Sequence, residues 1–373
     1  MPRLRPPTRR VLLGGLGAAI ASAPARHLQA STVGLAAAAA RTGRIFGAAV
    51  RSGQLADPAI RQAILRDCAA VTPEIELKWD AVEPMRGRLS LAGVDDIVKF
   101  AAENGRTVRG HTLMWHRSTP AWAEQLLRSQ RDWRLISRFF GSVMPRYGDV
   151  IRQWDVVNEP IDTGHRMDGL RQNVFLEAFG PDYIARALHE ARRFAPAARL
   201  MINDYSLEYD SQVERDRRYL LLRLIERLRK SGAPLDGLGL QGHLDLRKGT
   251  IAAASIAAFL KEVAGMGLEI VVTELDVKES DYAAPVDVRD RMVADEVRRY
   301  LDVVLAEKAV SGVLTWGLGD RQSWLEISTD DYNRFPTAWA KGGGPGLNRG
   351  LPYDAAMRPK PMYRAIEAAF AGR

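Results

Sequence analysis

Val271-Val272-Thr273-Glu274-Leu275-Asp276 and its distant counterpart Trp154-Asp155-Val156-Val157-Asn158-Glu159-Pro160 are the stretches that decide the fold of this chain. Each is an apolar run rich in β-branched residues that stops at a glutamate. Runs of this kind are typical of strands covered on both faces, as in parallel sheets. Because the carboxyl ends of parallel strands meet at one edge, the two stretches predict that Glu159 and Glu274 lie at the same rim.

Similar runs recur along the chain and alternate with helical stretches about eight times. The predicted strands are Ile45 to Val50, Ala70 to Leu77, Arg106 to Thr112, Ile151 to Asn158, Arg199 to Asp204, Gly237 to His243, Glu269 to Thr273 and Gly312 to Trp316. Helical periodicity predicts helices over Val94 to Glu103, Arg134 to Arg146, Tyr183 to Phe194, Gln212 to Ser231, Ser255 to Gly265, Asp290 to Val310 and Met362 to Phe370. This alternation predicts the α/β class and, from the number of units, a single (β/α)8 TIM barrel.

The composition excludes several classes of protein. With 373 residues, 46% hydrophobic and 26% charged, the chain has an ordinary globular composition. The formal charge of +8 falls to +4 when the four arginines among the first ten residues are set aside, and the remaining excess is scattered. We therefore expect no nucleic-acid partner. Cys68 is the single cysteine, which excludes an intramolecular disulfide and a zinc site built on several thiolates.

The N-terminal segment has the pattern of an export signal. A basic region containing Arg9-Arg10 precedes a short apolar stretch that ends at Ala21-Ser22-Ala23-Pro24-Ala25. Residues 1–25 are therefore predicted to be a signal peptide of the twin-arginine type, followed by a lead-in over 26–43 and a catalytic domain over 44–373. The apolar run is too short to span a bilayer, so we expect a periplasmic or extracellular protein with no membrane contact in its mature form.

Polar side chains capable of holding a sugar follow nearly every predicted strand. They are Glu74, Lys78, His111, Trp115, His116, Asn158, Glu159, Asn203, Asp204, Tyr205, Gln241, His243, Glu274, Asp276 and Trp316. Amides, imidazoles and carboxylates can bind hydroxyl groups, and indole rings can stack on the apolar face of a sugar. Two facing carboxylates are the minimum equipment for breaking a glycosidic bond.

Four motifs resemble glycoside hydrolase family 10, the endo-1,4-β-xylanases. They are Gly110-His111-Thr112-Leu113-Met114-Trp115-His116, residues 154–160, Gly239-Leu240-Gln241-Gly242-His243-Leu244 and Thr273-Glu274-Leu275-Asp276, and the resemblance runs from about Gly43 to Phe370. It implies a retaining endo-1,4-β-xylanase that hydrolyses β-1,4-xylan or xylo-oligosaccharides through a covalent glycosyl-enzyme. It implies no cofactor and no metal, and we expect a monomer.

The resemblance also implies a role for each site residue. Glu159 is implied as the general acid/base and Glu274 as the nucleophile, while Asn158 is expected to bind the sugar 2-hydroxyl. His243 and Asp276 are expected to orient and tune Glu274. The remaining expected contacts are Glu74, Lys78, His111 and Gln241 on the glycone side, Trp115, Trp316 and Trp324 as its walls and floor, and Tyr205 near the aglycone.

Three positions depart from the family pattern. Ile75 stands where the family usually has Asn after the glutamate of Glu-Asn-x-Met-Lys-Trp, Ser118 stands for the Gln before Thr-Pro, and Ser206 stands for Asn. All three changes remove or shorten hydrogen-bonding groups near the glycone or aglycone, so we expect them to affect substrate preference and chain-length dependence and to leave the cleavage chemistry intact.

Two other patterns in the sequence resemble binding motifs but lack the required context. Gly237-x-Gly239-x-x-Gly242 fits a dinucleotide fingerprint as a string, but the glycines lie inside a predicted strand and no helix follows them. His111 and His116 lack a third ligand at a suitable spacing for zinc. Two alternatives stay open: a retaining β-glycosidase or transglycosylase acting on another β-1,4 glycan, and a non-catalytic polysaccharide-binding protein.

Overall fold

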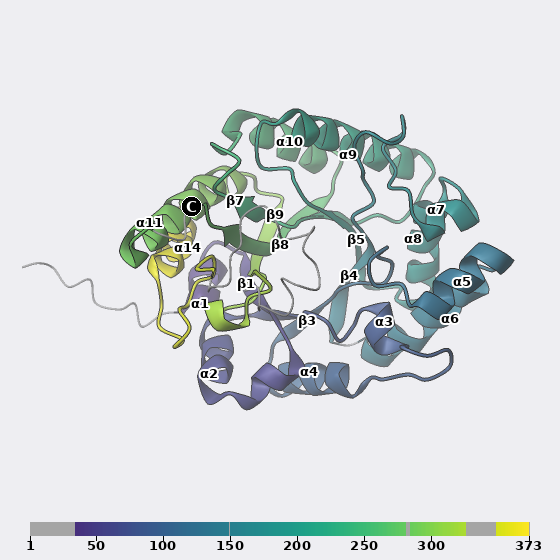
Figure 1. Cartoon of the computed structure of the whole chain (residues 1–373), viewed down its shortest axis with the longest axis horizontal. Helices are drawn as coiled ribbons and strands as arrows, with labels where there is room; N and C mark the ends of the chain where they lie inside the picture. The colour runs from purple at the N-terminus through teal and green to yellow at the C-terminus, as the bar shows by residue number, and fades with distance from the viewer. Residues whose placement is uncertain (1–33, 149, 281–283, 326–347, 373) are drawn as a thin grey trace, which may run out of the picture. The chain divides into compact units, whose positions relative to one another are not determined.

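The strands form a closed barrel of parallel strands. The structure is a computed structural model that describes residues 34–148, 150–280, 284–325 and 348–372. The strands are β1 (Ile45–Val50), β2 (Ala70–Pro73), β3 (Thr107–Gly110), β4 (Ile151–Asn158), β5 (Arg199–Asp204), β6 (Gly237–Leu240), β7 (His243–Asp245), β8 (Glu269–Lys278) and β9 (Val310–Thr315). Their order is β6-β5-β4-β3-β2-β1-β9-β8-β7, and a further β6–β8 pairing closes a ring of eight, which Figure 1 shows from one end. The predicted TIM barrel is confirmed.

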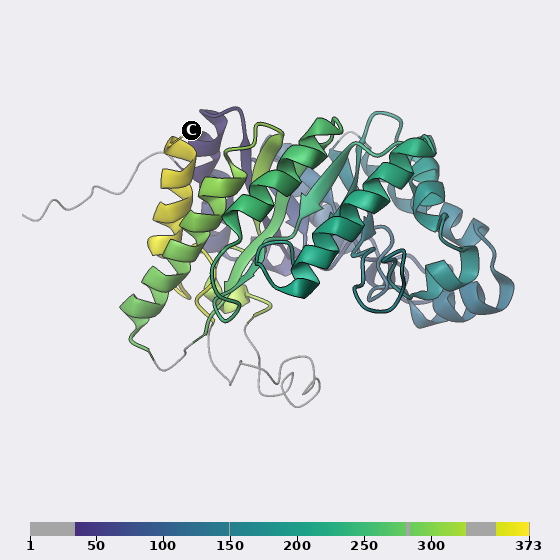
Figure 2. The ribbon, with the colours of Figure 1, turned by 90° about the horizontal axis from the view of Figure 1, so that it is seen from above.

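Helices surround the barrel and cover the outer faces of the strands. They are α1 (Leu35–Ala40), α2 (Pro58–Asp67), α3 (Trp79–Val82), α4 (Ala92–Glu103), α5 (Ala121–Gln130), α6 (Arg134–Val143), α7 (Val174–Phe179), α8 (Tyr183–Phe194), α9 (Gln212–Lys230), α10 (Ala253–Gly265), α11 (Val286–Val304) and α14 (Pro361–Ala371), with single 3-10 turns at Ser52–Ala56, Pro145–Tyr147 and Asp320–Gln322. In Figure 2 the long helices α9, α10 and α11 lie across the barrel wall. Within the described residues, none of these helices combines the length and the apolarity needed to cross a bilayer.

Several predicted strand bounds were wrong, and each error has a local cause. The run predicted from Gly237 to His243 is divided into β6 and β7, because Gly242 takes a left-handed conformation with φ 73° that interrupts the strand. Strand β2 ends at Pro73, which has no N–H to donate to a ladder, and not at Leu77. Strand β8 continues past Thr273 because its second half pairs with β7.

The helices show similar differences. Val310 was predicted as the end of a helix, but α11 stops at Val304 and Val310 opens β9. Helix α6 ends at Val143, just before Pro145, whose ring cannot continue the helix. Helix α2 was not predicted, although Asp57 caps it by accepting hydrogen bonds from the N–H groups of Ala59 and Ile60.

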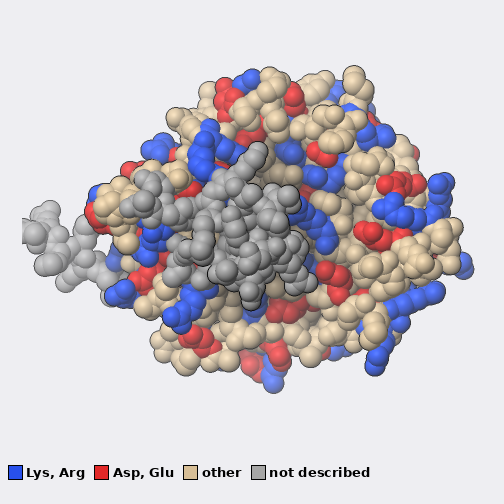
Figure 3. Space-filling view, viewed as in Figure 1, with Lys and Arg blue, Asp and Glu red and all other residues tan. Residues whose placement is uncertain are grey.

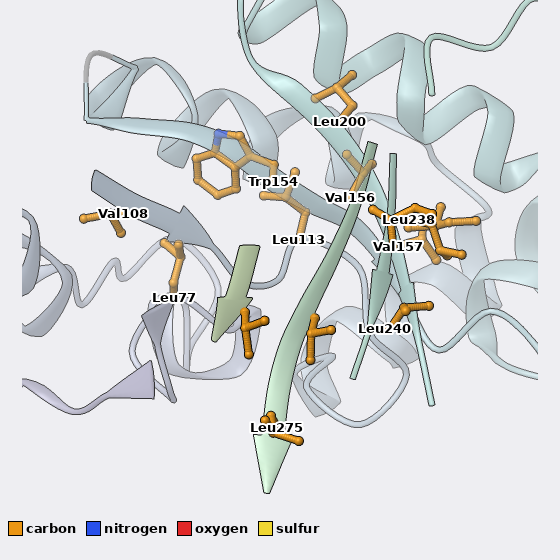
Figure 4. Close-up of a cluster of buried hydrophobic side chains, with 14 of the residues drawn as sticks. Leu77, Val108, Leu113, Trp154, Val156, Val157, Leu200, Leu238, Leu240 and Leu275 are labelled. Carbon is orange, nitrogen blue, oxygen red and sulfur yellow. The ribbon is translucent and has the colours of Figure 1, made fainter. Parts of the chain in front are cut away.

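Two groups of buried side chains hold the barrel together. The larger lies between strands and helices, and Figure 4 shows part of it around Trp154, Val156 and Leu238. The smaller is formed by Ala70, Met201, Val271 and Leu314, which come from β2, β5, β8 and β9. Because these strands are spread around the ring, their shared cluster fills the barrel interior, as is typical of this fold.

The surface agrees with the scattered charge expected from the sequence. In Figure 3 basic and acidic side chains are interspersed over the described part of the face shown. The predicted signal peptide and residues 26–33 of the predicted lead-in lie outside the described residues, whereas residues 34–43 of the lead-in are described and include α1.

Candidate functional site

A cavity of about 580 Å³ lies at the carboxyl ends of the strands and gathers the predicted site residues. Its lining includes every side chain given a role from the sequence: Glu74, Lys78, His111, Trp115, Asn158, Glu159, Tyr205, Gln241, His243, Glu274, Asp276, Trp316 and Trp324. The lining also includes Ile75, His116, Arg117, Arg171, Ser206, Lys248 and Lys278. We call this cavity the cleft.

Glu159 directly follows β4 and has an unusual backbone. Its φ is 56°, a left-handed value that costs a non-glycine residue about 1 kcal/mol or more. Two contacts hold this conformation: the Glu159 N–H donates to the carbonyl of Asn203 at 2.7 Å, and Nε of Arg171 donates to the Glu159 carbonyl at 2.8 Å. Arg171 also donates to the carbonyl of Ile161, so it fastens the chain on both sides of Pro160.

Glu274 lies within β8 and is surrounded by hydrogen-bond donors. Its side chain is buried, and its two carboxylate oxygens are bound at 2.6 Å by Nδ2 of Asn203 and at 3.2 Å by Nε2 of His243. Burial favours the neutral acid, but the His243 hydrogen bond, the charges of His111 and His243 and the Asn203 hydrogen bond outweigh it and lower the pKa of Glu274 to about 2. Glu274 is therefore ionised at neutral pH.

His243 is held as a cation between two carboxylates. Its Nδ1 lies 2.8 Å from Oδ1 of Asp276, which in turn accepts a 2.6 Å hydrogen bond from Nε1 of Trp324 on its other oxygen. Burial opposes the charge on the ring, yet the charges and hydrogen bonds of Asp276 and Glu274 raise the pKa of His243 well above its ordinary value. His243 therefore contacts both Asp276 and Glu274, which is the arrangement that the predicted tuning of Glu274 requires.

Amide side chains connect the two glutamates across the cleft. Nε2 of Gln241 lies 3.3 Å from both Oε1 of Glu159 and Oδ1 of Asn158, and Nδ2 of Asn203 lies 2.9 Å from the same Asn158 oxygen and 2.6 Å from Glu274. The Asn158 oxygen therefore accepts from two amides. Nδ2 of Asn158 has no partner among the described residues and is available to donate to a sugar hydroxyl.

The residues predicted for the glycone side combine a cation, a carboxylate and indole rings. Nζ of Lys78 lies 4.9 Å from the ring centre of Trp115 and 5.6 Å from that of Trp316. Burial lowers the pKa of Lys78 despite the nearby acids. Glu74 is buried and accepts a 2.6 Å hydrogen bond from Arg51, which fixes its position in the wall.

Two histidines flank the glutamates. His111 is buried with its Nδ1 2.9 Å from Asp155 and 4.0 Å from Oε1 of Glu274. The peptide bond between His111 and Thr112 is cis. His116 lies with Nε2 4.0 Å from Oε2 of Glu159, and burial together with the charges of Arg171 and Arg117 lowers its pKa to about 3. The His116 ring is therefore neutral near neutral pH.

Sequence reasoning gave no role to three residues that the structure places against the glutamates. Asn203 and His116 were visible as polar residues after strands, so their type and position were available as signals. Arg171 lies in an irregular connection after β4 and carried no such signal.

The departures from the family pattern fall into two groups. Ile75 and Ser206 line the cleft, as expected. Ser118 is buried, with 2% of its surface exposed, and is absent from the cleft lining. This position does not match the expectation that Ser118 lies near the glycone or aglycone.

The arrangement can carry out chemistry that needs two unlike carboxyl groups. Glu274 is ionised and held rigidly, whereas Glu159 is partly exposed to the cleft and its carboxyl contacts Gln241 and lies near the neutral His116. One group is thus suited to attack an electrophilic carbon and the other to exchange a proton with a leaving oxygen or water.

Comparisons with known proteins identify similar chains over nearly the whole described length. The family model described as Glycosyl hydrolase family 10 matches residues 34–369. Endo-1,4-beta-xylanase 3 of Hypocrea jecorina (strain ATCC 56765 / BCRC 32924 / NRRL 11460 / Rut C-30) is 32% identical over 307 residues, which cover 81% of this chain and 76% of that protein. Endo-1,4-beta-xylanase B of Thermotoga neapolitana is 30% identical over 303 residues, covering 81% and 80%.

A solved structure extends the similarity to three dimensions. Xylanase 10B from Thermotoga petrophila RKU-1, determined in complex with xylobiose, superposes with a TM-score of 0.78 at 27% sequence identity. The superposition covers 92% of this chain and 98% of that one.

Proposed function

The chain belongs to glycosyl hydrolase family 10, and on that premise we propose that it is an endo-1,4-β-xylanase that hydrolyses internal β-1,4 bonds of xylan with retention of configuration. Relatives about 30% identical over four fifths of the chain are xylanases, and one similar structure holds xylobiose. The same residues that resemblance singled out in the sequence line one cleft.

In the first step, Glu274 attacks the anomeric carbon while Glu159 protonates the glycosidic oxygen. The bond between the anomeric carbon and that oxygen breaks, the aglycone leaves as an alcohol, and a glycosyl ester forms on Glu274. The low pKa of Glu274 keeps it ionised for the attack. Asn158, with its oxygen occupied by two amides, donates from Nδ2 to the sugar 2-hydroxyl as charge develops.

In the second step, Glu159 acts as the base. Glu159 is ionised after it has given its proton to the aglycone, and its carboxylate removes a proton from water. The oxygen of that water attacks the anomeric carbon and displaces Glu274. Two inversions restore the original configuration. Each glutamate then has its starting protonation state.

The observation that carries this proposal is the unequal environment of the two glutamates within one cleft. Glu274 receives hydrogen bonds on both oxygens and has its pKa lowered to about 2, while Glu159 lies beside a neutral imidazole and a single amide donor. Different surroundings allow one carboxyl group to act as the nucleophile and the other as the acid, which two carboxyl groups in the same surroundings could not do.

Separate substitutions test the division of roles. Glu274→Ala should abolish turnover of xylan and of aryl xylosides alike. Glu159→Ala should abolish turnover of xylan but still release an acidic phenol from an aryl glycoside in a burst, because such a leaving group needs no proton. Equal loss on both substrates in the two variants would contradict the role assignment.

Product analysis tests the substrate and the stereochemistry together. Proton NMR of unbranched xylan digests should show β-anomeric reducing ends before mutarotation and a mixture of internal cleavage products. Faster release of reducing ends from cellulose or mixed-linkage glucan would favour the alternative β-glycan substrate. Tight xylan binding with no new reducing ends would favour a non-catalytic binding protein.

We also propose that the enzyme is exported through a twin-arginine route. The support is the order of Arg9-Arg10, a short apolar stretch and Ala23-Pro24-Ala25, all outside the described residues. N-terminal sequencing of enzyme from the culture fluid or periplasm should find a start near residue 26. Replacing Arg9 and Arg10 by lysines should retain an uncleaved precursor in the cytoplasm, and normal export of that variant would contradict the route.

A further inference from the structure

A second cavity, of about 420 Å³, lies on the outside of the barrel beside α9. Its lining is Met167 and Asp168 from the connection after β4, and Tyr219, Leu220, Arg223, Glu226, Arg227 and Lys230 from α9. On α9 these positions recur every three or four residues and therefore form one stripe along the helix. We call this cavity the α9 groove, and none of the proposed steps of catalysis uses it.

The groove exposes apolar and aromatic surface that a folded protein normally covers. Met167 is fully exposed at 100%, and 62% of the surface of Tyr219 is accessible. An exposed tyrosine offers a flat apolar face with a polar tip and has few rotamers to lose on binding. Such a ring is suited to stack against the apolar face of a pyranose.

The groove lining carries three cations, Arg223, Arg227 and Lys230, against two acids, Asp168 and Glu226. Both oxygens of Asp168 accept from Arg166, at 2.9 and 2.7 Å, and Glu226 accepts from Arg223 at 2.5 Å. Within the described residues no carboxylate lies within 4.0 Å of a nitrogen of Arg227 or Lys230, and Nη2 of Arg227 has no hydrogen-bond partner. The hydrogen bond from Arg166 and, more weakly, the charge of Arg227 lower the pKa of Asp168. Lys230 is exposed and Arg227 is partly exposed, so both side chains can contact a ligand.

A hairpin joins the α9 groove to the cleft. Ile161 pairs with Leu170 in an antiparallel bridge, and the Asp162 N–H donates to the carbonyl of Gly169 at 2.9 Å. Just beyond the base, Arg171 enters the cleft, while the tip brings Met167 into the groove. A polysaccharide held in the groove would therefore keep other parts of its chain close to the cleft.

We propose that the α9 groove is a second polysaccharide-binding site that takes xylan carrying uronate substituents. Tyr219 stacks on a sugar ring, and Arg227 and Lys230 bind the carboxylate. Uncharged xylan would gain the ring contact alone. The choice of xylan rests on the proposed function, whereas the requirement for a ring face and a carboxylate rests on the groove itself.

Binding is measured with full-length Glu274→Ala protein, so that the polymer stays intact. Affinity electrophoresis in gels containing glucuronoxylan or unbranched xylan gives the retardation of this protein and of the same protein carrying Tyr219→Ala or Lys230→Gln. Loss of an aromatic anchor worth more than ~1 kcal/mol should weaken binding about fivefold or more. Lys261→Gln is the matched control, since it removes the same charge from an exposed site on α10.

The expected result has three parts. Tyr219→Ala weakens retardation in both gels, Lys230→Gln weakens it in glucuronoxylan alone, and Lys261→Gln changes neither. With Glu274 intact, Tyr219→Ala and Lys230→Gln should hydrolyse a small aryl xylobioside at the wild-type rate, because the groove lies outside the cleft.

Two results would overturn the proposal. One is unchanged retardation of the Tyr219→Ala protein in both gels, and the other is an equal effect of Lys230→Gln on charged and uncharged xylan. If the proposed function were wrong, the wild-type chain would not hydrolyse xylan, whatever the result of the binding experiment.

Discussion

Replacing His243 by Asn should move the acid limb of the pH profile upward. Glu274 has a pKa of about 2 against an ordinary 4.5, a difference that corresponds to about 3 kcal/mol in favour of its ionised form. Burial acts against that form, and the hydrogen bond from His243 is the largest contribution that overcomes burial, with the charge of His243 adding to it. Asn keeps a polar side chain but carries no charge. If half of the stabilisation is lost, the pKa of Glu274 rises by about one pH unit.

The assay is kcat/KM for an aryl xylobioside as a function of pH, which reports the ionisation of the free enzyme. His116→Asn is the matched control: it also replaces a cleft imidazole, but one that lies 4.0 Å from Glu159 and is not among the groups that lower the pKa of Glu274. The His243→Asn profile should fall at higher pH than the wild-type profile, and the His116→Asn profile should not. Coincident acid limbs for His243→Asn and wild type would refute the electrostatic reasoning.

The same ionisation links pH to stability. The pKa of Glu274 is lower in the folded enzyme than in the unfolded chain, so its contribution to stability is fully present above about pH 4.5 and is lost as pH falls toward about 2. In His243→Asn this contribution is smaller. The melting temperature of the variant should therefore depend less steeply on pH across that window than the melting temperature of the wild type, as measured by calorimetry.

Other substitutions test the packing, the acid/base glutamate and the cleft wall. Gly110→Ala should lower the free energy of unfolding by roughly 1–3 kcal/mol in urea titrations, because an added Cβ would lie 2.3 Å from the Trp154 ring; unchanged stability would contradict this packing. Arg171→Lys should reduce kcat by about tenfold or more with the melting temperature nearly unchanged, because the lysine cannot hold both carbonyls around Glu159; wild-type kcat would argue against the positioning role. Ile75→Asn places an amide where an apolar side chain is 42% exposed in the cleft, and should lower KM for short xylo-oligosaccharides by about fivefold, with kcat on polymeric xylan retained; an unchanged KM would place Ile75 outside the contacts that matter.

Three strands could be predicted to the residue. The bounds predicted for β1, β4 and β5 are those observed, because in each the local pattern and the tertiary pairing agree. Errors arose where one residue decides the backbone, as Gly242 does between β6 and β7, or where pairing with a neighbour extends a strand, as in β8. Neither effect is visible in hydrophobic periodicity.

For the candidate site, the sequence predicted which residue types meet but not how they are bonded. Every residue given a role lines the cleft, since strand ends are fixed by the barrel topology. The contacts of Asn203 with Glu274, 71 positions away, and of Arg171 with the Glu159 carbonyl depend on side-chain directions and loop paths. Ser118 shows the opposite error, because a residue close to the site in sequence is buried away from it.

The amino-acid sequence by itself determined the barrel, the order of its strands and the pair of glutamates at its rim, because alternating local periodicities leave few ways to bury the apolar runs. Only the tertiary structure decided the hydrogen bonds and charges that lower the pKa of Glu274 and the formation of the α9 groove. A pKa depends on the burial and charges within a few ångströms of a carboxyl group, and a groove depends on which surfaces two distant segments leave uncovered. Both are properties of proximity in space, which a local pattern does not encode.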